Sequence, residues 1–186
     1  MNTTHYTDEE LCQAIEQGLI TEEYHADSKD VIQELNRLRA TEIASYLQYK
    51  QHAYMAVSLL SPGLKQDFQA HADIEIKHAD QLGERVQQLG GVPIFNPEEL
   101  GAKAAEEGVQ PMQGATLHDM VVQNLILERQ QVAAYTSLIR KLRDDDLITR
   151  QILLQILAET EQHASELADY LKRSVETQRR DTKLSR

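Results

Sequence analysis

A stretch near the middle of the chain, DIEIKHADQL (residues 73–82), carries polar residues where a helix should present an apolar face. The apolar positions that follow are Leu82, Val86 and Leu89. Counted back at helical spacing, the same face continues through His78, Glu75 and His71. The three-residue step of Glu-x-x-His turns about 300°, so its carboxylate and imidazole can reach one metal pair. We expect His71 at the rim of such a site or behind its ligands.

Two further segments repeat this arrangement of polar residues within apolar stripes. Glu42 is followed seven residues later by Tyr49, and Glu128 is followed seven residues later by Tyr135. The Glu-x-x-His motif comes after the first pair, and His163 comes after the second pair. We expect each tyrosine to be buried and to donate a hydrogen bond to a neighbouring carboxylate. The chain therefore has an internal two-fold pattern.

Carboxylates placed on core-facing stripes need a compensating charge. Burying them without a partner costs several kcal/mol each, and no Lys or Arg lies at the centre of these stripes. A bound cation would compensate them, and glutamate and histidine ligands suit Fe, Mn or Zn. The single cysteine, Cys12, excludes an internal disulfide and a Cys-rich metal cluster. A Glu from each of two helices with Glu-x-x-His from the others is typical of di-iron carboxylate bundles.

Four long helices must position these residues, and the sequence predicts them. Asp27 or Ser28 and Thr116 are candidate N-caps, while SPG and RDDDL predict tight turns. The segment between the second and third long helices is rich in Pro and Gly, which predicts a crossover with at most one helical turn. The fold class is therefore all-α, a ferritin-like four-helix bundle with a long crossover between the second and third long helices. The predicted core helices cover residues 28–60, 64–89, 116–143 and 147 to the 170s.

Composition and charge limit the remaining choices. We divide the chain into an N-terminal extension with a short helix (1–27), the bundle (28–175) and a basic, flexible tail (176–186). The net charge of -11 argues against the main body binding nucleic acid or an anionic membrane. No apolar run approaches the roughly 20 residues of a membrane span, and the start lacks a signal-peptide pattern. A cytoplasmic protein is the simplest interpretation.

The segments LNRLRATEIASYLQYKQHA, DIEIKHADQLGERVQQLGGVP, NLILERQQVAAY and ILAETEQHASELADYL resemble the core helices of bacterioferritin-type and Dps-type ferritins. The resemblance covers roughly residues 28 to 172. It implies a homo-oligomeric shell of roughly 12 or 24 subunits that oxidises Fe(II) at a di-iron site in each subunit and stores the mineral inside. It also places Tyr49 beside that site. The residues that fall on ferroxidase ligand positions are Glu42, Glu75, His78, Glu128 and His163.

The sequence departs from this family pattern at two positions. Haem-binding members have a methionine immediately after the glutamate that corresponds to Glu75, but this chain has Ile76 there, so we expect no haem. Thr160 stands three residues before His163, where a glutamate belongs. The spacing of the first hairpin points instead to Glu161, which cannot share a face with His163. Glu159 lies on the same side as His163 but farther from the centre of the stripe.

The missing carboxylate predicts an asymmetric site. Three carboxylates leave two divalent ions with excess positive charge, so the second ion should bind more weakly. We expect a tight ion at Glu42, Glu75 and His78 and a weaker one near Glu128 and His163, completed by water, hydroxide or Glu161. Iron is the expected metal, and Mn or Zn could substitute for it.

Several functions fit these residues, and ferroxidase activity with iron storage is the leading one. The oxidant, O₂ or H₂O₂, is not specified by the sequence. A Dps-like shell that consumes peroxide and protects DNA is the alternative, suggested by the basic C-terminal segment KRSVETQRRDTKLSR. A manganese catalase has similar ligands, whereas a rubrerythrin would need additional Cys pairs. A shell subunit with impaired ferroxidase activity is suggested by Thr160.

Overall fold

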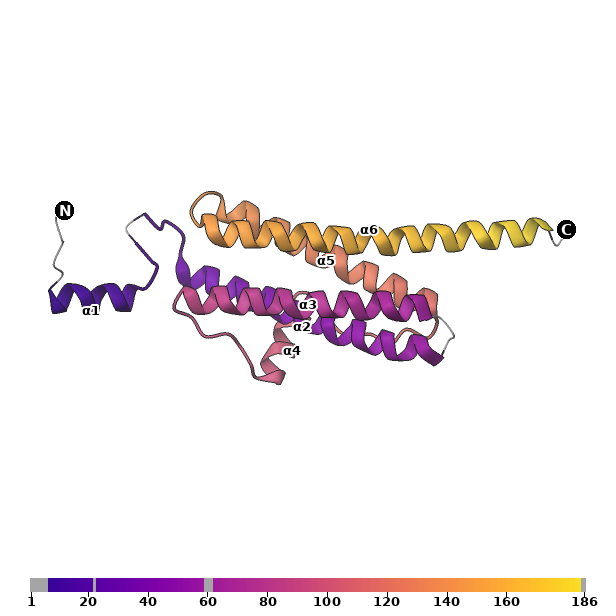
Figure 1. Ribbon diagram of the computed structural model, residues 1–186, viewed down its shortest axis with the longest axis horizontal. Coiled ribbons are helices and arrows are strands. Elements are labelled where there is room, and N and C mark those ends of the chain that lie inside the picture. Colours follow the sequence, from indigo (N-terminus) through magenta and orange to yellow (C-terminus); the bar gives the residue numbers. More distant parts are fainter. Residues whose placement is uncertain (1–6, 22, 59–61, 185–186) are drawn as a thin grey trace.

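The computed structural model describes residues 7–21, 23–58 and 62–184, and these residues form helices without any strand. Figure 1 shows the helices in chain order, with α1 lying beyond one end of the others. The helices are α1 (Asp8–Gln17), α2 (Ser28–Ser58), α3 (Pro62–Gln88), α4 (Pro97–Glu106), α5 (Leu117–Leu142) and α6 (Leu147–Leu184).

Four of these helices form a bundle of two hairpins. Helix α2 packs along α3, and α5 packs along α6 (Figure 1). The two hairpins join through contacts of α2 with α5 and of α3 with α6. A long crossover joins α3 to α5, and only short connections join the two helices of each hairpin, as predicted for a ferritin-like bundle, so the predicted fold class is confirmed. Ser61 of the predicted SPG turn lies outside the described residues.

Local side chains and one glycine set the ends of these helices. The Asp27 carboxylate accepts hydrogen bonds from the amides of Lys29 and Asp30, which confirms it as the cap of α2. Thr116 and Asp119 form a reciprocal capping box at the start of α5. Gly90, at a φ of 82°, ends α3 in a left-handed conformation that other residues rarely adopt.

The crossover contains more helix than the sequence predicted. Helix α4 is 10 residues long, whereas we expected at most one helical turn from the density of Pro and Gly. Its first turn explains the difference, because Asn96 caps the amide of Glu98 and Pro97 occupies the first helical position, where proline is favoured. Gly101 is exposed and has open space around it, so α4 accommodates it.

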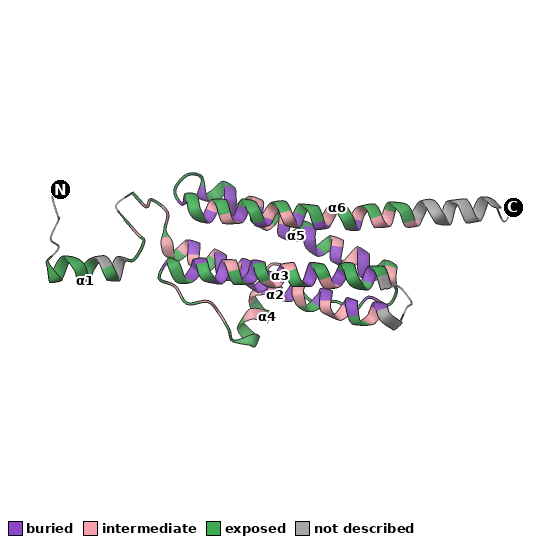
Figure 2. Cartoon of the chain, viewed as in Figure 1, coloured by how far each residue is buried: buried purple, intermediate pink, exposed green. Residues whose placement is uncertain are grey.

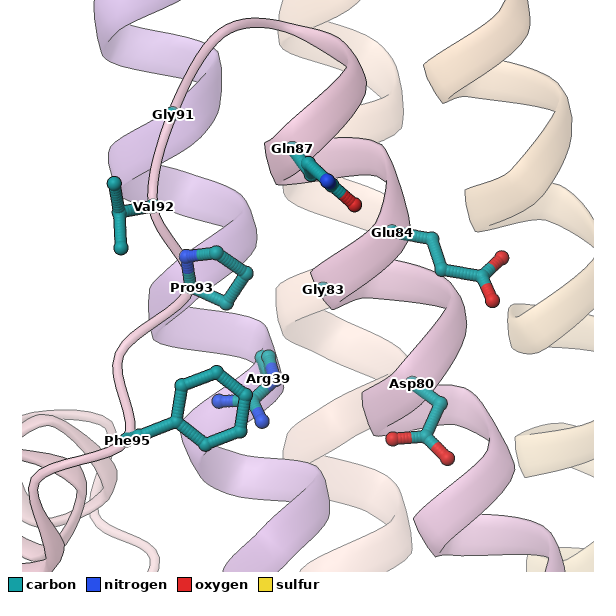
Figure 3. Close-up of a pocket in the computed structure, with 9 residues that line it drawn as sticks. All are labelled: Arg39, Asp80, Gly83, Glu84, Gln87, Gly91, Val92, Pro93 and Phe95. Carbon is teal, nitrogen blue, oxygen red and sulfur yellow. The ribbon is translucent and has the colours of Figure 1, made fainter.

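Two polar side chains of α2 hold the start of the crossover against the bundle. Asn36 accepts a hydrogen bond from the amide of Ile94, and Arg39 donates to the carbonyl of Ile94. The guanidinium carbon of Arg39 lies 4.7 Å from the centroid of the Phe95 ring. Figure 3 shows the two side chains next to each other. A surface hollow of about 610 Å³ lies here, where the chain leaves α3 (Figure 3). The contact anchors the crossover and lies outside the layer of candidate ligands.

Both ends of the chain extend past the bundle. The described side chains of α1 are exposed (Figure 2), and Tyr24 fixes the following segment by donating a 2.9 Å hydrogen bond to Asp146. Helix α6 continues to Leu184, past its predicted end in the 170s, so the predicted tail boundary falls inside a helix. The proposed flexibility of residues 176–186 stays a prediction. Over the described residues, no helix is long and apolar enough to cross a membrane.

The bundle interior has an apolar cluster toward each end and a polar layer between them. One cluster lies where α2 and α6 begin and includes Leu35, Leu82 and Ile156. The other lies around Phe68 and Met120, toward the opposite end. Figure 2 shows buried residues along the faces that the bundle helices turn toward one another. The polar layer between the clusters contains the candidate ligands.

Candidate metal centre

All five predicted ligands lie in this polar layer. Glu42 comes from α2, Glu75 and His78 come from α3, Glu128 comes from α5, and His163 comes from α6. Each is buried, with an exposed fraction of 4% or less. Four helices therefore bring charged and polar side chains together where an apolar core would be expected.

The first group of potential ligands consists of Glu42, Glu75 and His78. One ligand atom from each lies within 4.8 Å of the others. Glu42 Oε1 accepts hydrogen bonds from Gln131 (2.8 Å) and from the Tyr135 hydroxyl (2.6 Å). These bonds fix the carboxylate and leave its second oxygen, Oε2, facing His78 Nδ1 at 3.3 Å.

The second group consists of Glu128, His163 and His71, again with ligand atoms within 4.8 Å of one another. His163 Nδ1 lies 3.4 Å from Glu128 Oε1 and 3.2 Å from Glu75 Oε1, so Glu75 links the two groups. The Tyr49 hydroxyl donates a short hydrogen bond to Glu128 Oε1, the contact predicted for this tyrosine. His71 is 6% exposed, so it is buried rather than placed at the rim.

Thr160 and the two glutamates that flank it on α6 lie in different surroundings. Thr160 is buried, and its hydroxyl donates to the Ile156 carbonyl at 3.0 Å. Glu161 is exposed and belongs to neither group. Glu159 Oε2 accepts from His78 Nε2 at 3.0 Å, so it contacts the back of a candidate ligand. None of the three puts a carboxylate among the ligand atoms of the second group.

Burial and the neighbouring charges shift the pKa values of several side chains in this layer. Burial, then the neighbouring Glu128 and Glu42, raise the pKa of Glu75 well above its usual value. Burial and the nearby carboxylates also raise the pKa values of Tyr49 and Tyr135, which therefore stay protonated as donors. Three carboxylates in so little space favour binding of a cation, which would favour the ionised form of Glu75.

The imidazoles of α3 differ in their pKa values. Burial, followed by the nearby His163, lowers the pKa of His71 and favours the neutral ring that can bind a metal. Burial also acts to lower the pKa of His78, but the carboxylates of Glu42 and Glu159 outweigh it and raise that pKa overall. The raised pKa of His78 favours its protonated form, which competes with metal binding.

Buried polar atoms without a hydrogen-bond partner indicate whether a metal fits this layer. Four buried ligand atoms have no hydrogen-bond partner: Glu42 Oε2, His78 Nδ1, His71 Nδ1 and Glu128 Oε2. Each buried atom left unpaired costs about 1–3 kcal/mol. Two of them belong to each group, and all are nitrogen or oxygen donors of the kind that Fe, Mn and Zn accept. The donor set therefore fits two metal ions.

The sequence analysis did not identify several residues that shape this site. It did not predict Gln131 as a partner of Glu42, and it named neither Glu166 nor the contact between Glu159 and His78. The contacts of these two glutamates with His71 and His78 have a signal in the sequence. His71 and His78 on α3 are seven residues apart, and Glu159 and Glu166 on α6 have the same spacing.

Comparison with known families matches residues 32–175 to the Ferritin-like domain. The chain belongs to the ferritin-like family, as the resemblance of its four core segments predicted.

Named relatives fall into two groups. A nutrient stress-induced DNA-binding protein of a Synechococcus strain is 30% identical over 150 residues, which cover 77% of this chain and 82% of the relative. A DNA protection during starvation protein of Halobacterium salinarum is 30% identical over 78% of this chain and 80% of its own length. A bacterial ferritin of Pseudomonas aeruginosa is 31% identical over 72% of this chain and 80% of its own length. Iron storage or DNA protection is therefore the function at the level of the family.

Solved structures with the same fold include two bacterioferritin relatives. The dodecameric thioferritin of Bacteroides fragilis, a bacterioferritin-related protein, superposes with a TM-score of 0.75 at 26% identity, over 83% of this chain and 92% of its own. The bacterioferritin of Desulfovibrio desulfuricans, described with a diiron site, superposes with a TM-score of 0.68 at 22% identity. That alignment covers 77% of this chain and 78% of the bacterioferritin and shows a shared fold.

Proposed function

We propose that this chain oxidises Fe(II) at a di-iron carboxylate site in each subunit and stores the ferric product inside a homo-oligomeric shell. The observation that carries the proposal is the pair of buried groups in the middle of the bundle, in which four ligand atoms lack a hydrogen-bond partner. The ferritin-like family and the diiron bacterioferritin of the same fold support it.

The ligands divide between two iron positions. Glu42, Glu75 and His78 hold one Fe(II), and Glu128 and His163 hold the other, with the Glu75 carboxylate between the two groups. Each Fe(II) gives up one electron, so a pair supplies the two electrons that reduce O₂, with two protons, to H₂O₂. The same pair reduces H₂O₂, with two protons, to two waters. Holding both ions together lets a two-electron acceptor be reduced in one event.

The surrounding side chains orient the carboxylates. Tyr49 donates to Glu128, and Tyr135 donates to Glu42 from the opposite hairpin. Such outer partners fix the direction of the oxygens that remain free for the metal. We place Tyr49 beside the site as a positioning residue.

Exposed apolar side chains support assembly into a shell. Leu47, Tyr54, Phe95 and Ile126 are between 47% and 73% exposed on the bundle and its crossover. A hollow of about 420 Å³ between α2 and α4 is lined mostly by apolar side chains, including Leu47 and Leu100. Contiguous apolar surface of this kind is typical of an interface, and the thioferritin of the same fold is dodecameric. A shell of roughly 12 or 24 copies would cover it.

Initial rates of Fe(II) oxidation test the proposed reaction. Glu75→Gln and Glu128→Gln each remove one carboxylate charge from the surroundings of the two iron ions, at nearly constant side-chain volume. We expect each to slow oxidation by about 100-fold or more, which corresponds to an increase of roughly 3 kcal/mol in the activation barrier. Glu161→Gln is the matched control, because Glu161 is exposed and should leave the rate unchanged. Unmodified rates in both carboxylate variants, or a stable 21.2 kDa monomer in light scattering, would contradict the proposal.

DNA protection is the second candidate function. Two kinds of relative are named for DNA binding or DNA protection, and the last segment of this chain is basic while the whole chain has a charge of -11. A gel shift at low salt, with the full chain and with residues 176–186 removed, tests it. Retardation that depends on the tail and is lost at higher salt supports this function, and no retardation by the full chain argues against it.

A further inference from the structure

Two histidines of α3 are held by two glutamates of α6 in the same way. His71 and His78 are seven residues apart, which is about two helical turns, so they lie on one face of α3. Glu166 and Glu159 have the same spacing on α6. His78 Nε2 lies 3.0 Å from Glu159 Oε2, and His71 Nε2 lies 3.1 Å from Glu166 Oε2. The two contacts are therefore structural copies of each other.

The similarity between His71 and His78 extends to the other ring nitrogen, Nδ1. A carboxylate accepts hydrogen bonds, so each Nε2 carries the proton and each Nδ1 presents a lone pair. In His71 as in His78, Nδ1 is buried and has no hydrogen-bond partner. An outer carboxylate that fixes the tautomer of an imidazole is the usual arrangement behind a metal-binding histidine. His78 is a predicted ligand, and His71 has the same arrangement.

Packing directs His71 into the second group of ligand atoms. Its ring stacks on the His163 ring, with centroids 4.0 Å apart and planes 16° apart. Tyr49 packs edge-on against its other side, with centroids 5.2 Å apart at 88°. One ligand atom each of His71, His163 and Glu128 lies within 4.8 Å of the others. Donors on one ion at about 2.1 Å are at most about 4.2 Å apart, and an imidazole lone pair lies in its ring plane, so completing the site takes a small approach of the donors and a rotation of one ring out of the stack.

We infer that His71 is a direct ligand of the second iron and supplies the donor that Thr160 does not. The inference rests on the proposed di-iron site. The second iron is then held by two imidazoles and the Glu128 carboxylate, a donor set that suits Fe(II) and leaves coordination positions open. The first iron is held by two carboxylates and one imidazole, so the two positions differ in charge while each has three protein donors. His71 adds a bond without adding a negative charge.

Anaerobic Co(II) titration of the assembled protein tests this inference through d–d absorption, without any turnover. We expect two ions per subunit in the unmodified protein and one in His71→Leu, which removes the donor nitrogens and keeps an apolar side chain. The affinity for the second ion should fall by more than about 100-fold, because losing an outer partner alone typically costs 10–100-fold. Two equally tight ions in His71→Leu would overturn the inference and leave His71 as a packing residue.

Variants of the two outer glutamates provide matched controls. Glu166→Ala should weaken the second ion and Glu159→Ala the first, each by about 10–100-fold, because each removes the partner of one imidazole. If Glu166→Ala weakens neither ion, His71 does not act as His78 does, and the inference fails.

Anomalous diffraction from Co(II)-loaded crystals of the unmodified protein avoids any question of misfolded variants. A second peak within about 2.3 Å of His71 Nδ1 supports the inference. A second peak bound by Glu128 and His163 but more than about 3 Å from His71 overturns it. Absence of both peaks would instead contradict the proposed di-iron site itself, so the two failures are distinguishable.

Discussion

The two groups of buried candidate ligands contain three carboxylates and three imidazoles, and this balance would set how strongly two ions bind. Two divalent ions carry four positive charges, so one remains uncompensated. At the moderate effective dielectric of a protein interior, a unit charge about 4 Å away contributes about 4 kcal/mol before desolvation is counted. Thr160 is the position at which a fourth carboxylate would enter, since it is buried and lies one turn before His163.

Thr160→Glu should therefore strengthen binding of the second ion and raise the initial rate of Fe(II) oxidation. The same substitution should destabilise the metal-free protein by several kcal/mol, because it buries another carboxylate beside Glu75, whose pKa is already raised. Thermal unfolding with and without Co(II) measures both effects. A variant as stable as the unmodified protein without metal, or one with unchanged Co(II) affinity, would show that the new side chain does not enter the site.

The sequence pointed to candidate ligands through a pattern that the two hairpins share in part. Glu42 and Glu128 each precede a tyrosine by seven residues, Glu75 and His78 share one helical face, and such spacing is visible without a structure. The burial of His71 was not visible, because a histidine two turns from His78 reads equally well as a residue at the rim. Its stacking on His163 and its contact with an outer glutamate depend on how α6 packs against α3.

At the scale of the helices, one aspartate holds three segments together at the end of the bundle. Asp146, in the turn between α5 and α6, receives hydrogen bonds from Arg85 at the end of α3, from Tyr24 and from Thr149. Arg85 and Asp146 are each 3% exposed, so their ion pair is buried. Burial acts to raise the pKa of Asp146, but hydrogen bonds from Thr149 and the charge of Arg85 outweigh it and hold that pKa below its usual value.

Asp146→Asn should destabilise the fold by about 3–5 kcal/mol at neutral pH, because it leaves the Arg85 charge buried and unpaired. A carboxyl group with a lowered folded-state pKa stabilises the protein above its unfolded pKa of about 3.9 and loses that effect as the pH falls through the folded value. The difference between the two proteins should therefore shrink below about pH 4. Urea unfolding at pH 7 and at lower pH measures it, and a difference that grows on acidification would contradict this assignment.

The long helices were predictable and the connections less so. Core helices were found because apolar residues recur at helical spacing and caps such as Thr116 mark their starts. Helix α4 was underestimated because Pro97 and Gly101 read as helix breakers, whereas Pro97 occupies the first turn and Gly101 lies in open space. Helix α6 continues to Leu184 although its last residues have no apolar stripe, so periodicity did not mark its end.

At the scale of the whole molecule, the isolated subunit cannot store a mineral. Over the described residues, its interior is filled by three apolar clusters and a polar layer, so the proposed ferric product would accumulate outside the bundle, in a space that several subunits enclose. The exposed apolar side chains on α2, α5 and the crossover, with the hollow between α2 and α4, are the surfaces available for that assembly. In the proposed function, oxidation would be a property of each bundle, and storage would be a property of the shell.

The measurement that tests the central claim most directly is anomalous diffraction at the iron edge from crystals soaked with Fe(II) without oxygen. The account predicts two iron positions inside every bundle, between the apolar clusters. One should be held by Glu42, Glu75 and His78, and the other by Glu128 and His163. Iron found only on the surface, or no iron in the layer that contains these residues, would contradict the proposed di-iron centre and the ferroxidase function derived from it.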